Sequence, residues 1–288
     1  MGWHCRFDDP VADSLSKVIL ITGCSSGIGH AIAHFFADED WNVVATMRHP
    51  GQSETDLKGA DNVDLVHLDV TDIDSIRDAV KFALDKYGRI DVLVNNAGYP
   101  VVGVFEAITS EQARKMFETN VLGLMDLTRE VLPAMRAQKS GIIVNVASMG
   151  GRTTFPLYSV YNSTKWAVEG FSEGLQYELR PQNIRVKIIE PGIIRTDFYG
   201  RSMVVAEKEG LADYDAFLES ALRGIKRSER DASPPEIVAL CIHRAVMDGS
   251  WRLRYHAGRN AGTILALRRT NTDRMFLAIM RRFSLPKK

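Results

Sequence analysis

The stretch KVILITGCSSGIGHAIAHFF, residues 17–36, places an apolar run, a glycine-rich turn and a helical pattern in immediate succession. Four consecutive residues of its first six, 18–21, are apolar, which is typical of a short strand buried on both faces. The turn carries Gly23, Gly27 and Gly29, and apolar side chains recur at helical spacing after it. A strand that leads through such a turn into a helix is the first unit of a doubly wound α/β fold.

The rest of the chain repeats this alternation of short apolar runs and helical patterns. Further strands are predicted at 41–47, 63–70, 90–98, 141–148, 184–192 and 251–258, and helices at 71–88, 110–135, around Tyr161 and at 233–249. Runs rich in Val and Ile that alternate with helices predict a parallel sheet covered on both faces. We therefore expect a single Rossmann-type α/β domain over residues 1–288, with a parallel sheet of about seven strands.

Single residues predict where two of these helices begin and end. Thr71 or Asp72 should cap the helix at 71–88, and Gly88 should stop it. Ser110 should cap the long helix at 110–135.

Composition narrows the class of protein. The chain has 288 residues, of which 45% are hydrophobic and 25% charged, and its formal net charge is zero. No overall positive field therefore indicates a nucleic-acid partner. The three cysteines are widely spaced, the first residues lack the apolar run of a signal peptide, and no stretch approaches the ~18 apolar residues of a membrane span. We expect a cytoplasmic protein. His30, His34 and His67 have no paired ligands in the sequence, so no metal site is expected.

The glycine-rich turn TGCSSGIG predicts a phosphate site. Gly23 permits a sharp turn, Gly27 lets the backbone approach a pyrophosphate, and Gly29 lets the helix pack close to the sheet. The helix that follows offers free N–H groups and the positive end of its dipole. The GxxxGxG spacing differs from the more common GxGxxG, but its place between a strand and a helix predicts a nucleotide.

Two further residues indicate which nucleotide binds. Asp69 ends the third predicted strand, where it can accept a hydrogen bond from an adenine amino group or cap the next helix. Arg48 follows the second strand, whose end lies near the adenosine ribose in a sheet of this order. An acid there would favour NAD, whereas an arginine accommodates the 2′-phosphate of NADP. Arg48 could also be an ordinary surface charge, but Thr46 and Met47 supply no acid, so NADP(H) is favoured.

Tyr161 and Lys165 are four residues apart in YSVYNSTKWAVEG, residues 158–170, and would lie on the same face of a helix. Such a pair commonly occupies a helix surface without further consequence. The alternative is a proton donor tuned by a cation. A free phenol has a pKa near 10, and a cation within about 4–6 Å lowers that pKa.

Together the motifs resemble the compact branch of the short-chain dehydrogenase/reductase family, with similarity to its hydroxysteroid and retinol dehydrogenases. They are TGCSSGIG, LDVT, NNAG, ETNVLG, NVASMGG, YNSTK and PGIIRT, and they follow the family's order over roughly residues 16–197. The resemblance implies that Tyr161 is the catalytic acid or base, that Lys165 supplies the cation and that Ser148 holds the substrate oxygen. It also implies that Asn120 breaks its helix locally; the alternative is an exposed helix residue.

The resemblance implies an oxidoreductase that uses NADP(H) to interconvert a ketone or aldehyde and an alcohol. The expected cofactor-binding residues are Gly23, Ser25, Ser26, Gly27, Ile28, Gly29, Arg48, Asp69, Val70, Asn96, Gly98, Tyr161, Lys165, Pro191, Gly192, Ile194 and Thr196. A nucleotide-sensing protein without turnover is the alternative function. The presence of Asn120 and Ser148 beside Tyr161 and Lys165 favours the enzyme, because a sensor does not need all four.

The substrate should lie beside the motifs that meet the nicotinamide. The candidate wall residues are mostly apolar, which favours a lipophilic carbonyl or alcohol; they are Val101, Val102, Phe105, Phe155, Leu157, Tyr158, Phe198, Tyr199 and Met203. The charged segment 197–233 breaks the alternation. It is either a lid over the substrate or a solvated helical hairpin.

The tail at 260–288 has seven basic residues and one acid, Asp273, so its charge is +6 and that of the remaining chain is −6. Apolar residues recur among its arginines and predict one amphipathic helix. We expect this helix to pack on the protein's own body or on a second subunit of a homo-oligomer. Contact with a membrane surface is the alternative, because basic amphipathic helices lie at interfaces.

Overall fold

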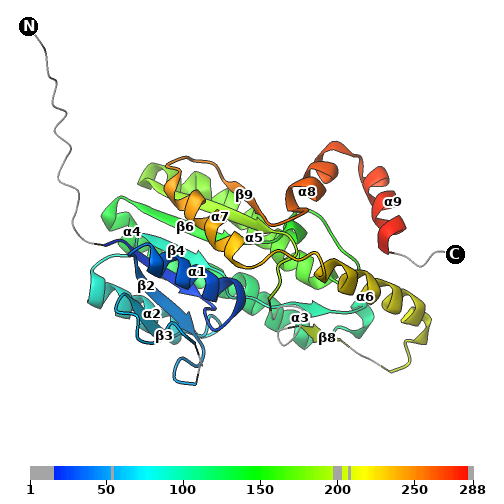
Figure 1. Ribbon diagram of the computed structural model, residues 1–288, viewed down its shortest axis with the longest axis horizontal. Coiled ribbons are helices and arrows are strands. Elements are labelled where there is room, and N and C mark those ends of the chain that lie inside the picture. The colour runs from blue at the N-terminus through cyan, green and yellow to red at the C-terminus, as the bar shows by residue number, and fades with distance from the viewer. Residues whose placement is uncertain (1–15, 53–54, 197–202, 207–208, 285–288) are drawn as a thin grey trace, which may run out of the picture.

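Seven parallel strands form the central sheet in a computed structural model, which describes residues 16–52, 55–196, 203–206 and 209–284. Their order is β3-β2-β1-β4-β6-β7-β9 (Figure 1). The strands are β1 Val18–Thr22, β2 Asn42–Met47, β3 Val63–His67, β4 Val92–Asn95, β6 Gly141–Val146, β7 Ile184–Pro191 and β9 Arg254–Ala257. The predicted doubly wound fold and its seven strands are confirmed. The order reverses direction between β1 and β4, and open α/β sheets bind ligands at such a switch point.

Helices cover both faces of this sheet. On one face, α1 (Gly27–Asp38) and α7 (Glu236–Met247) lie side by side over a core built from both helices and the sheet. On the other face, α2 (Ile73–Tyr87), α4 (Gly123–Gln138) and α5 (Ser159–Leu179) contribute to a second core. The sheet is therefore buried on both sides, as its Val- and Ile-rich strands require.

The ends of α2 are those predicted. Asp72 is the cap, and its side chain accepts a hydrogen bond from the N–H of Asp74 at 3.0 Å. Gly88 ends the helix with a φ of 71°, a left-handed conformation that glycine adopts at little cost. Of the two caps considered, the structure selects Asp72 over Thr71.

The prediction that Ser110 caps the next helix is wrong. Thr109 is the cap, because its hydroxyl accepts from the N–H of Gln112 at 3.1 Å while the Gln112 side chain accepts from the N–H of Thr109 at 2.9 Å. This reciprocal pair is a capping box, and it requires the polar residue to stand three positions before the Gln.

The long helix predicted at 110–135 is interrupted. α3 (Ser110–Phe117) passes through one π-helical turn, Glu118–Leu122, into α4. Asn120 lies within this turn and is buried. The local break that the resemblance implied at Asn120 is therefore present, and the reading of Asn120 as an exposed helix residue is wrong.

The segment after β7 contains both a strand and a helix among its described residues. β8 (Val204–Val205) pairs in parallel with β5 (Val101–Val102), and α6 (Asp215–Glu229) follows. Apolar residues of α6 pack against the β5 region in a third core.

The tail forms two helices, α8 (Ala261–Thr270) and α9 (Asp273–Ser284), so the prediction of one continuous helix is wrong. The chain becomes extended at Asn271, whose side-chain amide donates to the carbonyl of Leu267 at 2.8 Å and closes α8. α9 then folds back against α6 (Figure 1). The side chain of Phe276 on α9 is buried. None of the helices in the described part of the chain combines the length and apolarity needed to cross a bilayer.

Candidate active site

The glycine-rich turn has the conformation that its sequence requires. Gly23 and Gly27 have φ values of 74° and 60°, in the left-handed region that residues with a Cβ rarely adopt. Gly29 serves packing, because a Cβ at this position would lie 2.2 Å from the carbonyl oxygen of Gly23. Gly29 itself is buried beneath the turn, whereas Gly23 and Gly27 line the cleft above it.

The first turn of α1 is prepared for an anion. Ser26 is its N-cap but makes no side-chain hydrogen bond to the helix, and the first turn contains no acidic residue. The first N–H groups of a helix have no partner within the helix. Together with the helix dipole they form a phosphate site, so the chain's residues fit the pyrophosphate of a dinucleotide at this point.

A cleft of about 1610 Å³ runs along the carboxyl ends of the strands. Of the residues predicted to bind cofactor or act in catalysis, those that line it are Gly23, Ser25, Ser26, Gly27, Ile28, Arg48, Asp69, Val70, Asn96, Gly98, Ser148, Tyr161, Lys165, Pro191, Gly192, Ile194 and Thr196. Gly29 and Asn120 lie behind its wall. The volume exceeds the roughly 300–1,000 Å³ of an ordinary ligand pocket, which leaves room for two molecules.

Asp69 and Arg48 lie at one end of this cleft. Asp69 comes two residues after the end of β3, and its carboxylate accepts from the N–H and hydroxyl of Thr71 at 2.9 and 2.8 Å. Asp69 therefore braces its own turn, and Asp72 rather than Asp69 caps α2. Burial raises the pKa of Asp69, but the hydrogen bonds from Thr71 outweigh it and lower the pKa overall. Arg48 is exposed beside the cleft, and its backbone carbonyl is 2.7 Å from Nδ1 of His67.

Two asparagines at the end of β4 fix the floor of the cleft. The Asn95 amide donates to Asn145 on β6 at 2.9 Å, which ties the two neighbouring strands together. Asn96 donates to the carbonyl of Thr22 at 2.9 Å, and its own N–H donates to the Thr22 hydroxyl at 2.9 Å. The floor is thus held by side chains as well as by the sheet ladder.

Lys165 is buried beside Tyr161. Its Nζ donates to the carbonyl of Val146 at 2.9 Å and lies 5.9 Å from the centre of the Tyr161 ring. Burial lowers the pKa of Lys165 to about 8, and the charge of Glu169 partly opposes this shift. The four-residue spacing in the sequence therefore corresponds to an ammonium held under a phenol, and the reading as an exposed surface pair is wrong.

Ser148 stands at the end of β6 with its hydroxyl oriented. Its Oγ accepts from the N–H of Gly150 at 3.0 Å. Because this bond occupies an acceptor site of the oxygen, the hydroxyl proton remains available to a ligand in the cleft.

Asn120 joins the π-helical turn to the active-site floor. Its side chain accepts from the N–H of Tyr99 and donates to the Tyr99 carbonyl, both at 3.0 Å, and it also donates to the hydroxyl of Thr164 at 3.2 Å. A Cβ on Gly98 would lie 2.9 Å from its Oδ1. Asn120 therefore positions the helix that carries Tyr161 and Lys165.

The segment after β7 closes over the glycine-rich turn. Thr196 lies against Gly27, where an added Cβ would be 3.2 Å from the Cβ of Thr196. Ile194 is buried and forms a parallel bridge with Ser233. The predicted motif at 191–196 thus lies opposite the first turn of α1.

Two buried carboxyl groups behind Lys165 were missed from the sequence. Glu169 follows Lys165 by one helical turn, and Glu190 immediately precedes Pro191 at the end of β7. Burial, with the Glu190 charge, raises the pKa of Glu169 to about 7, although Arg254 donates to its carboxylate at 2.9 Å. The glutamate in IIEPG interrupts an apolar run, which was the available signal.

The predicted substrate wall is only partly correct. Phe155 and Tyr158 line the cleft. Val101 and Val102 are instead core residues of β5, and Leu157 and Met203 pack in the same core.

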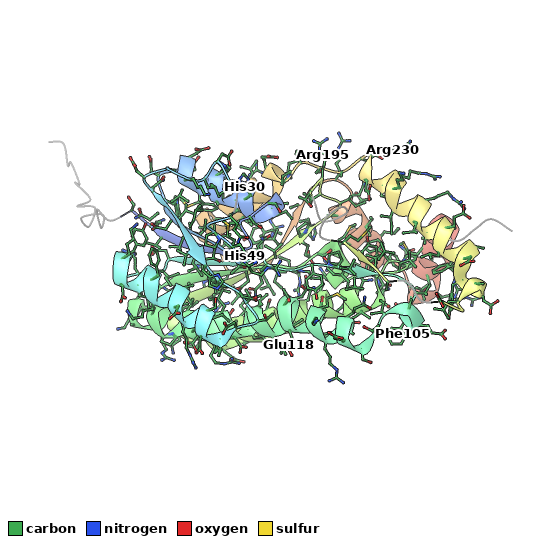
Figure 2. The ribbon with its side chains drawn as sticks, turned by 90° about the horizontal axis from the view of Figure 1, so that it is seen from below. His30, His49, Phe105, Glu118, Arg195 and Arg230 are labelled. Atoms are coloured by element: carbon green, nitrogen blue, oxygen red, sulfur yellow. The ribbon has the colours of Figure 1, made fainter. Side chains whose placement is uncertain are left out.

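Phe105 is 70% exposed and lies at the lower margin of the molecule in Figure 2, away from the cleft. The sequence showed that the candidate wall residues are mostly apolar and lie near the nicotinamide motifs, but not which way each side chain would face. Phe198 and Tyr199 lie outside the described residues.

The far wall of the cleft comes from α6 and the tail. Its residues are Ala221, Gly224, Ile225, Ser228, Asn260, Ile264, Leu267, Phe276, Ile279 and Met280. The spacing of the last three, i, i+3 and i+4, indicated one apolar face. Only the fold shows that this face is turned toward the catalytic residues.

Two histidines expected to lack partners are paired. Nε2 of His30 and Nε2 of His34 each lie 2.8 Å from the same carboxylate oxygen of Asp56. The partner was not visible because it lies in a loop more than twenty residues away.

A family model described as short chain dehydrogenase matches residues 17–203, which include the glycine-rich turn, Ser148, Tyr161 and Lys165. The chain belongs to the short-chain dehydrogenase family.

Two relatives of this short-chain dehydrogenase show how far the similarity extends. An uncharacterized oxidoreductase of Schizosaccharomyces pombe is 39% identical over 238 residues, covering 82% of this chain and 98% of the relative. A 3-ketodihydrosphingosine reductase of Bacteroides thetaiotaomicron is 35% identical over 231 residues, covering 80% and 83%.

Three solved structures have a similar fold. One from Streptomyces avermitilis superposes with a TM-score of 0.80 at 35% identity, covering 93% of this chain and 97% of that one. ElxO with NADP bound gives 0.70 at 28% identity, covering 84% and 98%. A 3-ketoacyl-(acyl-carrier-protein) reductase from Brucella melitensis in complex with NADH gives 0.72 at 25% identity, covering 86% and 98%. Structural neighbours therefore bind either nicotinamide dinucleotide.

Proposed function

We propose that the protein is an NADP(H)-dependent oxidoreductase that interconverts a ketone or aldehyde and an alcohol on a lipophilic substrate, with Tyr161 as the proton donor and acceptor. The observation that carries the proposal is the buried Lys165 ammonium, 5.9 Å from the Tyr161 ring, in a cleft that also contains the glycine-rich turn. A Tyr–Lys contact that served only to stabilise the fold would not need to line a cleft.

Four residues of the chain each have a separate role in carbonyl reduction. Ser148 donates to the substrate oxygen, which fixes that oxygen near Tyr161. Tyr161 then gives its hydroxyl proton to the oxygen as the alcohol forms, and NADPH, when bound, supplies the hydride. Lys165 stabilises the phenolate left on Tyr161, because a nearby positive charge favours the ionised phenol. Asn120 keeps these groups in place through Tyr99 and Thr164.

The preference for NADP(H) rests on Arg48. It is exposed at the end of β2 beside the cleft, where a guanidinium can meet a 2′-phosphate. β2 itself ends in Thr46 and Met47, so neither of its last residues supplies the carboxylate that would hold the ribose of NAD.

The substrate class rests on the far wall of the cleft. α6, α8 and α9 present mainly aliphatic side chains, such as Ile225, Leu267 and Ile279, together with the ring of Phe276. Apolar walls of this kind favour burial of an alkyl chain over a sugar, by roughly 0.8 kcal/mol for each CH₂ removed from water. A relative named as a reductase of a ketodihydrosphingosine supports the same class. Similarity to hydroxysteroid and retinol dehydrogenases stays a prediction.

We also propose a single functional domain over 1–288 that acts as a cytoplasmic homo-oligomer. Leu122, Trp166 and Tyr177 are large apolar side chains that are 43%, 47% and 74% exposed, and Trp166 and Tyr177 lie on α5. Cys24 and Cys241 are free thiols, which suits a reducing compartment.

The test is a panel of carbonyl compounds assayed by NADPH absorbance. It should contain 3-keto compounds with alkyl chains of increasing length and a sugar ketone as a polar comparison. We expect NADPH consumption with kcat/KM rising with chain length. Absence of turnover in either direction on every compound would overturn the enzymatic proposal. A preference for the sugar would overturn the substrate class alone.

A further inference from the structure

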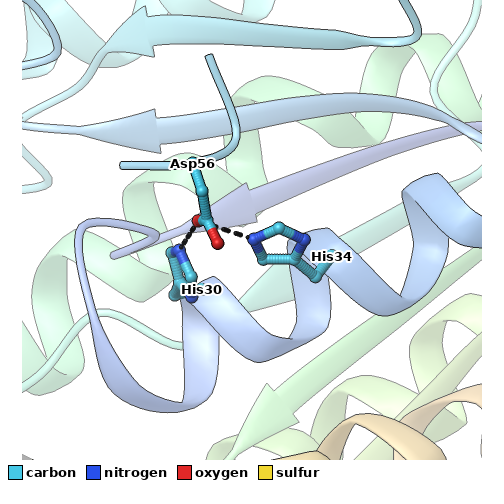
Figure 3. A group of neighbouring side chains, drawn as sticks. All are labelled: His30, His34 and Asp56. Atoms are coloured by element: carbon cyan, nitrogen blue, oxygen red, sulfur yellow. Dashed lines mark hydrogen bonds and ion pairs between the residues drawn. The ribbon is translucent and has the colours of Figure 1, made fainter. Parts of the chain in front are cut away.

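Figure 3 shows three side chains that the reaction does not use. His30 and His34 project from neighbouring turns of α1, and Asp56 reaches them from the connection between β2 and β3. The two imidazole rings lie edge to face, with centroids 4.7 Å apart. One carboxylate oxygen lies 2.8 Å from Nε2 of each ring.

The arrangement offers three ligand atoms for one metal ion. The ligand atoms of the three residues lie within 4.8 Å of one another. In a tetrahedral zinc site with bonds of about 2.0–2.1 Å, ligand atoms are roughly 3.3 Å apart. Each His–Asp separation of 2.8 Å therefore has to open by only about 0.5 Å. Rotations of exposed side chains can supply such a shift.

The chemistry of the ligands and their setting also suit a metal ion. Two histidines at i and i+4 present both imidazoles on one helix face, as in helical zinc-binding motifs. Imidazole favours Zn²⁺, Cu²⁺ or Ni²⁺ over Mg²⁺. In the described part of the chain, neither lysine nor arginine forms an ion pair with Asp56, and its close side-chain partners are the two histidines. Solvent reaches the cluster and can complete the coordination, because the Asp56 side chain is 71% exposed.

We propose that His30, His34 and Asp56 form a binding site for a divalent transition-metal ion such as Zn²⁺, with water as the remaining ligand. An imidazole that binds a metal ion through Nε2 carries its single proton on Nδ1, so any proton on Nε2 moves there or passes to solvent as the ion binds. The site is separate from Tyr161 and Lys165 and performs no step of the reaction.

Occupation of this site ties two parts of the cofactor cleft together. α1 begins at the glycine-rich turn, whereas the connection that carries Asp56 also carries Arg48, His49 and Gln52 along the cleft. A metal ion bound by both elements holds the connection that carries Asp56 against α1. The ion should therefore protect this connection from proteolysis.

The decisive experiment titrates the full-length, chelator-treated protein with Zn²⁺ in competition with a chromogenic indicator. Wild-type protein should bind one equivalent at this site, and Mg²⁺ should not compete. His34→Gln and Asp56→Asn should each weaken binding by about tenfold or more, since even disturbing the partner of a ligand costs 10- to 100-fold. With Co²⁺ as a probe, wild type should give a ligand-field spectrum that both variants lose.

Two controls separate the site from general binding by histidine. His243→Gln removes an imidazole whose Nε2 lies 3.9 Å from Glu39, a pair with only two ligands, and should leave the titration unchanged. A variant with His4→Gln and Cys5→Ser removes ligands near the N-terminus and should also keep the site.

Circular dichroism and thermal unfolding without metal should show that every variant is folded, since each substituted cluster side chain is partly or largely exposed. Zn²⁺ should raise the Tm of wild type and of both controls but not of the cluster variants. The proposal is overturned if wild type binds no stoichiometric Zn²⁺, or if His34→Gln and Asp56→Asn bind it as wild type does.

Discussion

Replacement of Tyr161 by Phe is the most direct test of the proposed chemistry. The change removes one oxygen atom from a ring that is 7% exposed, so the ring should keep its packing against Tyr158, 5.8 Å away between centroids. A general acid typically contributes about 10²–10⁴ in rate, which corresponds to roughly 2.7–5.4 kcal/mol in the barrier. We expect kcat to fall by this factor.

Cofactor binding should respond much less to the same substitution. A single neutral hydrogen bond contributes about 0.5–1.5 kcal/mol, so the Kd for NADPH should rise by no more than about tenfold. Fluorescence titration measures the Kd, and single-turnover kinetics measure the chemical step. A fall in kcat that is matched by an equal loss of NADPH affinity would show that Tyr161 acts through binding.

Tyr158→Phe is the matched comparison. It removes the same atom from a neighbouring ring that is also 7% exposed and also lines the cleft. Its kcat should fall far less than that of Tyr161→Phe. The assignment of the proton donor is refuted if Tyr161→Phe retains the wild-type kcat, or if both variants lose activity equally.

Three further results are expected. Arg48→Asp should abolish the preference for NADPH over NADH, a loss of roughly tenfold to a hundredfold in NADPH affinity, because a charge-assisted hydrogen bond contributes about 1.5–3 kcal/mol; equal wild-type Kd values for the two cofactors would contradict this. The folded-state pKa of Glu169 is raised from 4.5 to about 7. Ionisation of Glu169 therefore lowers the free energy of unfolding progressively as the pH rises from about 4.5 to about 7. Urea unfolding at about pH 5 and about pH 8 measures the difference in unfolding free energy between the two pH values. Glu169→Gln should reduce this difference by on the order of 1–3 kcal/mol, and an unchanged difference would disprove the pKa shift. Phe276→Ala, which empties a site only 2% exposed, should detach α9, lower the Tm and raise KM for long-chain substrates, while Leu277→Ala, at a site 47% exposed, should do neither.

The features that could be predicted from the sequence are those set by local chemistry. Gly23 and Gly27 lie in left-handed backbone that few other residues adopt, so their spacing alone predicts the turn. Tyr161 and Lys165 lie on one helix, so the distance between them follows from helical geometry. The strands were recognisable because short runs that are apolar on both faces are typical of strands buried within a parallel sheet.

Features that depend on distant parts of the chain could not be predicted. The apolar face of the tail was visible as Phe276, Ile279 and Met280, but the sequence did not show that α6 and the catalytic cleft would cover it. Asp56 meets His30 only after the chain has passed through β2 and folded back toward α1. In both cases the pattern indicates that a side chain needs a partner, and the fold decides which one.

The cap of α3 shows a third kind of limit. Thr109 and Ser110 are adjacent, and both side chains can cap a helix. The choice depends on which of them stands three positions before Gln112, whose side chain completes the reciprocal bond. A one-residue boundary is therefore decided by a single side-chain amide.

The π-helical turn at 118–122 fixes the number of residues between two packed helices. Such a turn accommodates one residue more than an α-helix would, and each residue of an α-helix rotates the chain by about 100°. Loss of one residue here would straighten the helix and turn all of α4 by that angle. Leu127 and Val131, which are fully buried against the sheet, would then rotate out of the core. Natural variants should therefore tolerate substitution within this turn far better than any change in its length.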